Sequence, residues 1–122
     1  MTHPNRQTQY LQQVFQSLIQ SGDYAGLFNA MYNEASQNGL TLPWVHMKPH
    51  PLLVEWADRT NLEGESALVI GSGLGDDAEE LARRGFSVVG FDFSSTAISW
   101  CKKRFPSSSV QYYEADLFFL PS

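Results

Sequence analysis

The 122-residue sequence contains one cysteine, Cys101, and therefore has no internal disulfide framework. Basic residues are also few, because 8 Lys and Arg stand against 13 Asp and Glu and give a formal net charge of −5. Proteins that bind nucleic acid normally gather Lys and Arg on one face. The one basic cluster, Lys102-Lys103-Arg104, is better explained as cations in the last turn of a helix, where they complement its dipole. We therefore expect no nucleic-acid partner.

Long apolar runs are missing as well. The longest are of strand length, well short of the roughly 20 residues that span a bilayer. Residues 1–7 hold no apolar core of a secretory signal. We therefore expect a cytoplasmic protein with no membrane partner. What is present is apolar material for one packed domain, with 43% hydrophobic residues that include 8 Phe, 5 Tyr and 3 Trp.

Residues 1–63 have a helical pattern. Apolar residues at helical spacing predict a helix that ends at Gly22 and a second helix that Asp23 caps. Three prolines mark residues 42–51 as a loop, and a short helix is expected over residues 52–59. We interpret this part as an N-terminal helical cap with a proline-rich loop.

Residues 64–122 alternate between short strands and helices within the same structural domain. The strands are predicted over residues 66–70, 87–91 and 110–113, with a helix in each of the two gaps. A β-α-β-α-β order with crossover helices predicts an α/β fold with a parallel sheet.

A glycine-rich turn, Gly71-Ser72-Gly73-Leu74-Gly75, joins the first predicted strand to its helix. Backbone N–H groups and the positive end of a helix dipole can face a ligand there, and glycine leaves room for a close approach. Asp92 closes the second strand about 20 residues later, where an acid accepts hydrogen bonds from ribose hydroxyls. The two features predict a nucleoside site, with a purely structural turn and a helix cap as the alternatives.

Asp76 argues against a dinucleotide. It occupies the position of the last glycine in the dinucleotide fingerprint, where an acid would repel a pyrophosphate. S-adenosylmethionine carries an ammonium and a sulfonium group instead, and these favour acids such as Asp76 and Asp77. We therefore favour S-adenosylmethionine as the cofactor and keep a nicotinamide-dependent reductase as a weaker alternative.

Residues 67–77 and 85–94 together resemble the first two motifs of class I S-adenosylmethionine-dependent methyltransferases. They are most similar to the bacterial branch of small-molecule enzymes related to the thiopurine and thiol methyltransferases. The Pro43-Trp44 loop, residues 49–53 and Ala115-Asp116-Leu117 also match in order and spacing. The resemblance covers most of the chain from Pro43 onward.

The resemblance implies a role for each matching residue. Gly71, Gly73 and Gly75 would pass beneath the methionine portion of the cofactor, and Asp92 would bind the ribose hydroxyls. No catalytic residue is implied, because the residues that deprotonate the acceptor usually lie in the leading helices and beyond the third strand.

Three further residues receive roles from the resemblance. Asp77 would help hold the polar tail of the cofactor, and Asp116 would accept from the adenine amino group. Trp44 would pack beside the cofactor or in a substrate lid. The alternatives are an acidic first helical turn, a turn residue and a core aromatic, respectively. His46 and His50 have Pro49 between them and no third ligand nearby, so no metal site is expected.

The resemblance also implies a Rossmann-like sheet in the order 3-2-1, with a fourth strand beside the first in the complete fold. We expect the chain to be an N-terminal fragment that binds cofactor but transfers methyl groups to a small-molecule acceptor poorly. The alternative is a non-catalytic nucleoside-binding or interaction module. Because residues 66–70 would form an open sheet edge, we expect a homodimer through that strand.

Overall fold

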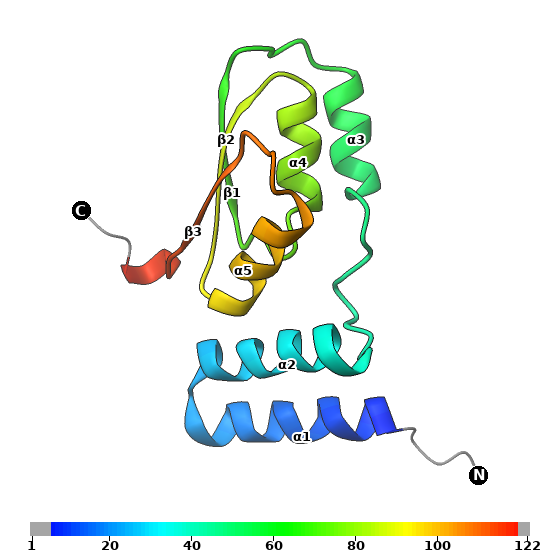
Figure 1. Cartoon of the computed structure of the whole chain (residues 1–122), viewed down its shortest axis with the longest axis vertical. Coiled ribbons are helices and arrows are strands. Elements are labelled where there is room, and N and C mark those ends of the chain that lie inside the picture. The colour runs from blue at the N-terminus through cyan, green and yellow to red at the C-terminus, as the bar shows by residue number, and fades with distance from the viewer. Residues whose placement is uncertain (1–5, 120–122) are drawn as a thin grey trace. The chain divides into compact units, whose positions relative to one another are not determined.

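The computed structural model describes residues 6–119. The chain divides into two compact units, of which the first ends at Pro43 and the second begins at Trp44. In the first unit, α1 (Arg6–Ser21) and α2 (Tyr24–Asn38) pack side by side as a helical hairpin (Figure 1). The connection follows the prediction, since Gly22 has a positive φ of 69° and the Asp23 side chain accepts from the Gly26 N–H at 3.0 Å.

The second unit holds a three-stranded parallel sheet in the order β1-β2-β3, as the sequence predicts. Its elements are α3 (Pro51–Asp58), β1 (Ser66–Ile70), α4 (Asp76–Arg83), β2 (Ser87–Asp92), α5 (Ser95–Arg104), β3 (Gln111–Glu114) and the short 3₁₀ helix η1 (Leu117–Phe119). The register places Val69 beside Gly90 and Gly90 beside Tyr112. This is the Rossmann-like arrangement expected from the alternating strands and helices.

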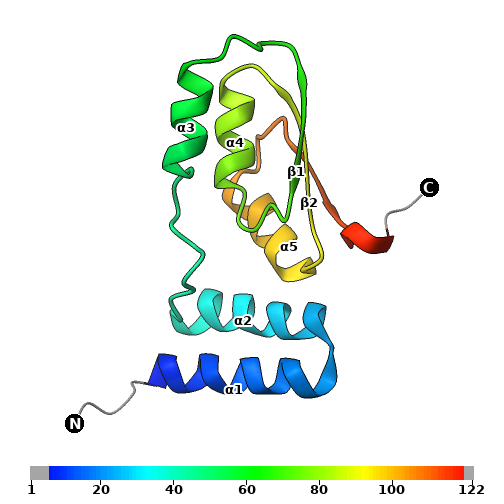
Figure 2. The ribbon, with the colours of Figure 1, turned by 180° about the vertical axis from the view of Figure 1, so that it is seen from behind.

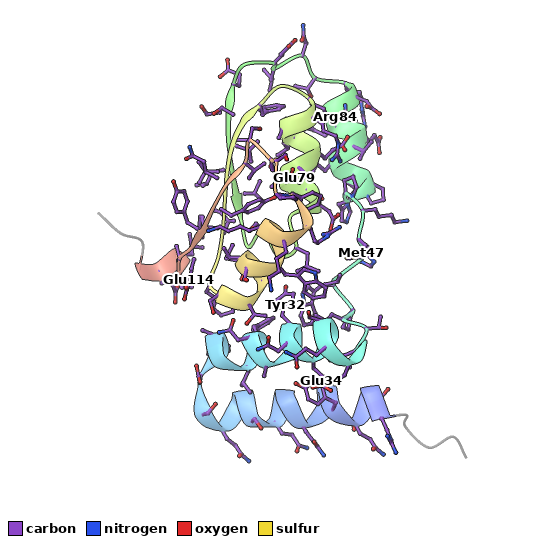
Figure 3. The ribbon with its side chains drawn as sticks, viewed as in Figure 1. Tyr32, Glu34, Met47, Glu79, Arg84 and Glu114 are labelled. Atoms are coloured by element: carbon purple, nitrogen blue, oxygen red, sulfur yellow. The ribbon has the colours of Figure 1, made fainter. Side chains whose placement is uncertain are left out.

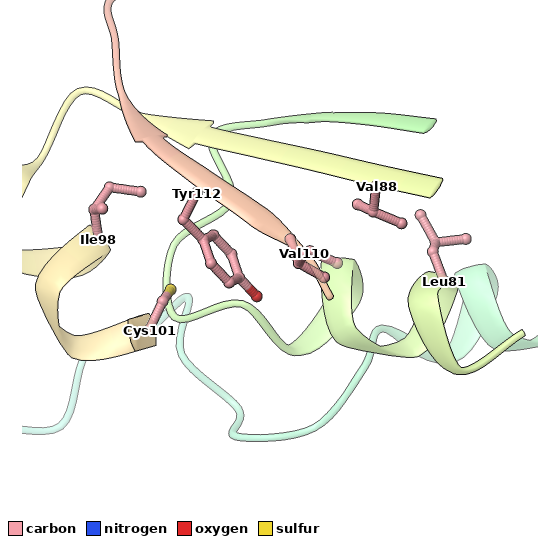
Figure 4. Packing of buried hydrophobic residues seen from close by; sticks show 7 residues of the cluster. Leu81, Val88, Ile98, Cys101, Val110 and Tyr112 are labelled. Atoms are coloured by element: carbon pink, nitrogen blue, oxygen red, sulfur yellow. The ribbon is translucent and has the colours of Figure 1, made fainter. Parts of the chain in front are cut away.

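Helices α4 and α5 cover one face of the sheet, as opposite views show (Figures 1 and 2). Strand residues alternate between faces, so Val88 and Tyr112 point toward these helices. The buried cluster between the layers consists of Ala78, Leu81, Val88, Ile98, Cys101, Val110 and Tyr112 (Figure 4). The core therefore lies between the sheet and these two helices.

The other face of the sheet is not covered by any described helix of the second unit. Leu68 and Ile70 of β1 are 58% and 54% exposed, and Tyr113 of β3 is 53% exposed. The structure covers β1 on one face only, where Ala67 and Val69 are half-buried against the core. Parallel strands are apolar on both faces because helices normally cover both, so the pattern alone does not show that one layer is missing.

Helix α3 belongs with the sheet and not with the first two helices. The His50 N–H, just before α3, donates to Asp77 Oδ1 at 2.8 Å. The guanidinium of Arg84, which Figure 3 labels, lies 2.8 Å from Asp58 Oδ1. These contacts explain why the units separate after Pro43, whereas the sequence pattern places the change near residue 63. Within residues 6–119, no helix has both the length and the apolarity needed to cross a membrane.

Candidate functional site

Three predicted groups meet at the carboxyl edge of the sheet. The glycine turn follows β1, Asp92 ends β2, and Asp116 comes just after β3. The Ala115 N–H donates to the Asp92 carbonyl oxygen at 3.0 Å and joins the ends of β2 and β3. In open parallel sheets this edge is where ligands bind.

The glycine turn has left-handed backbone at all three predicted glycines. Gly71, Gly73 and Gly75 have φ values of 66°, 54° and 91°, which disfavour any other residue. The space around them differs. A Cβ on Gly71 would meet nothing within 4 Å, whereas a Cβ on Gly75 would lie 2.5 Å from the Tyr112 hydroxyl oxygen. Open space therefore lies beside Gly71, whereas the core packs closely against Gly75.

Asp92 holds the glycine turn against β2. Its side chain is only 6% exposed, and its Oδ2 accepts from the Gly73 N–H at 3.0 Å. Its Oδ1 accepts from the Ser94 N–H at 2.9 Å, while Ser94 itself caps α5 through the Ala97 N–H. A carboxylate has about four acceptor positions, so these two contacts leave capacity for ribose hydroxyls.

Asp77 and Asp116 both make backbone contacts in this structure. The Asp77 carboxylate fixes the start of α3 through the His50 N–H, which adds a structural role to the one implied by the resemblance. Asp116 Oδ1 accepts from the Phe118 N–H at 2.9 Å. This contact is the one expected of a turn residue, which is the alternative role of Asp116. Trp44 is 38% exposed, and its place beside a cofactor stays a prediction.

Arg104 has a role that its sequence position does not reveal. The sequence indicates only a cation at a helix end, but the Arg104 guanidinium forms a two-pronged pair with the Asp76 carboxylate, each N–O distance being 3.0 Å. The same guanidinium donates to the Leu74 carbonyl oxygen at 2.7 Å. The negative charge of Asp76 is therefore neutralised locally, which weakens the argument that Asp76 repels a pyrophosphate.

A second feature that the sequence does not reveal is the buried carboxylate of Glu79. In the sequence Glu79 is one of several acids in the first turn of a helix. Glu79 Oε2 accepts from the Tyr112 hydroxyl and from the Ser108 hydroxyl, both at 2.6 Å. Burial and the adjacent carboxylate raise the pKa of Tyr112. The acid is thus part of the support beneath the glycine turn.

Cys101 is buried in the core, as its place in an apolar helical stripe predicts. Its Sγ donates to the Gly73 carbonyl oxygen at 2.9 Å. Burial raises the pKa of its thiol to about 12, so the thiol is neutral at physiological pH and is no nucleophile. In the residues that the structure describes, no cluster of three or more His, Cys, Asp or Glu could hold a metal.

Sequence and structure comparisons connect this site with known proteins. Residues 67–122 match the family described as "Methyltransferase domain". The chain is 33% identical over 103 residues to "Probable thiol methyltransferase 2" of Arabidopsis thaliana, covering 76% of this chain and 46% of that protein.

Two solved structures show the same fold. One comes from work on the conversion of a disulfide bond into a thioacetal group during echinomycin biosynthesis, with 32% identity, a TM-score of 0.65, and coverage of 75% of this chain and 39% of the other. The second is an S-adenosylmethionine-dependent methyltransferase from Thiobacillus denitrificans in complex with S-adenosylhomocysteine, with 25% identity and a TM-score of 0.52. It covers 74% of this chain and 36% of that chain. The chain thus spans less than half the length of these relatives.

Proposed function

Because the second unit is part of a class I S-adenosylmethionine-dependent methyltransferase domain, we propose that this chain binds S-adenosylmethionine at the glycine turn and presents it to a small sulfur acceptor. The observation that carries the proposal is the meeting of the glycine turn with the Asp92 carboxylate at the carboxyl edge of the sheet. Open space lies at Gly71, where an added Cβ would meet no atom within 4 Å.

The residues present fit such a cofactor. Backbone N–H groups at the start of α4 and the left-handed glycines form a surface that a ligand can approach closely. Asp92 keeps acceptor capacity for ribose hydroxyls, and Asp116, just after β3, is the residue that we assign to the adenine amino group. Asp77 supplies negative charge in the first turn of α4, next to which an ammonium group is favoured.

When bound, S-adenosylmethionine supplies a methyl group on an already activated sulfonium. The contribution of these residues is to bind and orient the cofactor, which is the main role of the protein in such a displacement. Asp92 and the glycine turn move no proton in this proposal. No general base is assigned among the described residues.

A sulfur acceptor is supported by two relatives that exceed 30% identity. One is described as a thiol methyltransferase, and the other comes from work on the conversion of a disulfide into a thioacetal. The sequence alone does not distinguish a thiol, a halide, a metalloid or a larger acceptor. We propose a thiol, with transfer at a low rate from this chain alone. Methyl-labelled cofactor offered with a small thiol, a thiopurine or iodide should label the thiol first.

Cofactor binding is the sharper test. Titration calorimetry should show tighter binding of S-adenosylhomocysteine than of NADH. Asp92→Asn retains one carbonyl acceptor for the backbone but removes the charge, and it should weaken S-adenosylhomocysteine binding about tenfold or more, because hydrogen bonds to charged groups contribute roughly 1.5–3 kcal/mol. Glu55→Gln, at an exposed acid on α3, is the matched control and should leave the affinity unchanged.

Each contrary result has a defined meaning. Tighter binding of NADH would favour the reductase alternative. No binding of either nucleotide by a well-folded chain would favour an interaction module. If the unmodified chain and the Asp92→Asn variant bind S-adenosylhomocysteine equally well, Asp92 does not contribute to the binding site.

A further inference from the structure

We propose that Arg104 is a positioning residue, which holds the glycine turn in its binding conformation and raises cofactor affinity without touching the cofactor. This inference rests on the proposed function, because it concerns the same turn. It starts from three hydrogen bonds that one guanidinium makes to the turn and to the first residue of α4. Two go to the Asp76 carboxylate and one goes to the Leu74 carbonyl oxygen.

These partners lie on both sides of a single glycine. Gly75 separates Leu74 from Asp76, has a φ of 91° and serves as the N-cap of α4 without any side-chain capping bond. Glycine has the largest backbone freedom of any residue. A single rigid group bound to the residues before and after it therefore limits motion at the point where the turn becomes the helix.

Helix α5 makes a second contact to the same turn. Cys101, one helical turn before Arg104, donates from Sγ to the Gly73 carbonyl oxygen. Two consecutive carbonyl groups, those of Gly73 and Leu74, are thus held by one face of α5. In a trans peptide the C=O and N–H groups point in opposite directions, so this anchoring turns the Leu74 N–H away from α5.

The ion pair between Arg104 and Asp76 is partly shielded from solvent. The Arg104 and Asp76 side chains are each 18% exposed, so solvent screens the pair less than it would a surface pair. Arg104 also lies over the Phe105 ring, with 4.7 Å from its guanidinium carbon to the ring centre. A planar fork matched to a carboxylate is a property of arginine that lysine does not share.

The test compares Arg104→Lys with Lys103→Gln. Arg104→Lys keeps the charge at the end of α5 but loses the fork, and it should weaken S-adenosylhomocysteine binding about tenfold. Lys103→Gln removes an exposed charge from the same helical turn and should leave the affinity unchanged. Calorimetry is carried out at a temperature where circular dichroism shows each variant fully folded. A lower melting temperature with unchanged affinity would overturn the proposal, since a merely structural role predicts that result.

A spectroscopic readout separates this inference from the proposed function. In ligand-free protein labelled with ¹⁵N, Arg104→Lys should shift or broaden the amide signals of Gly73 and Gly75, while Lys103→Gln should not. Unchanged glycine signals would overturn the positioning role whatever the affinities are. Shifted signals in a chain that binds no nucleotide would overturn the proposed function, and with it the effect on affinity, while the bracing of the turn would stand.

Discussion

Tyr112 of β3 and Glu79 of α4 share a hydrogen bond of 2.6 Å beneath the glycine turn, across a separation of 33 positions in the sequence. The same Tyr112 hydroxyl limits the space at Gly75. The sheet, the helix and the turn therefore meet at one polar contact. Figure 4 shows Tyr112 among the buried residues of the core.

Removing the Tyr112 hydroxyl should destabilise the fold. Tyr112→Phe leaves the buried Glu79 carboxylate with one donor fewer, and hydrogen bonds to charged groups contribute about 1.5–3 kcal/mol. Tyr113→Phe is the matched control, because that hydroxyl bonds an exposed Gln111 side chain on the open face. Urea unfolding measures both variants. Equal free energies of unfolding for the two variants would show that the buried contact contributes little.

Alkaline pH should weaken the fold through Cys101 and Tyr112. Burial raises the pKa of the Cys101 thiol from 9.0 to about 12, and burial with the Glu79 contact raises the pKa of Tyr112 above its ordinary 10.0. Both groups are almost entirely neutral in either state below about pH 8, so their stabilisation is then complete. Above that pH the unfolded chain loses these protons first.

The free energy of unfolding should therefore fall as pH rises from about 9 toward 12, by up to about 1.4 kcal/mol per pH unit for each group. Urea titrations across this range measure the slope. Cys101→Ser keeps a hydroxyl donor but does not titrate there, so its slope should be shallower. A slope identical to that of the unmodified chain would contradict the assignment of this effect to Cys101.

Asp77 should have two separable roles. Asp77→Ala removes the acceptor for the His50 N–H and should cost about 0.5–1.5 kcal/mol of stability. Asp77→Asn keeps a carbonyl acceptor for that N–H but removes the charge near the proposed ammonium group. We expect it to fold nearly as well as the unmodified chain and to bind S-adenosylmethionine about tenfold more weakly. Undiminished affinity of the Asp77→Asn variant would limit Asp77 to its structural role.

Because the Ser72 hydroxyl is buried without a hydrogen-bond partner among the described residues, we expect the glycine turn to tolerate the loss of this hydroxyl. A buried group without a partner costs roughly 1–3 kcal/mol. Ser72→Ala should therefore leave the melting temperature unchanged or raise it. Ser108→Ala should lower it, because that hydroxyl donates to Glu79 and accepts from the Val110 N–H. A marked loss of stability in the Ser72→Ala variant would mean that its hydroxyl has a partner in solution.

The sequence predicted the local features of the fold well. The positive φ of Gly22 and the capping bond of Asp23 depend only on residues nearby in the sequence. These positions marked the ends of helices without knowledge of the tertiary structure. The glycine turn and Asp92 were likewise predictable because their chemistry depends on their place after a strand.

Long-range polar contacts were not predictable in this way. Arg104 and Asp76 lie 28 positions apart, and each has a sufficient local explanation, a cation at one helix end and an acid at another. Their pairing depends on how α5 and α4 pack on the sheet. In the sequence Glu79 does not differ from the neighbouring acids. Only its contact with Tyr112 in the folded chain distinguishes it from them.

The open edge of β1 leads to the prediction about assembly. In the described chain β1 pairs with β2 on one side only, and its Leu68 and Ile70 side chains are more than half exposed. An unpaired apolar edge strand is a template for another strand. Two copies can join their β1 strands antiparallel about a two-fold axis, which would make one continuous sheet.

We therefore expect a homodimer in sedimentation experiments at low micromolar concentration. Leu68→Lys places a charge on the exposed face of β1, away from the core that Val69 contacts, and should shift the protein toward monomer. Leu62→Lys alters a partly exposed leucine outside the strand and should leave the dimer intact. A monomeric unmodified chain with a cooperative thermal transition would show that the β1 edge is stable without a partner strand.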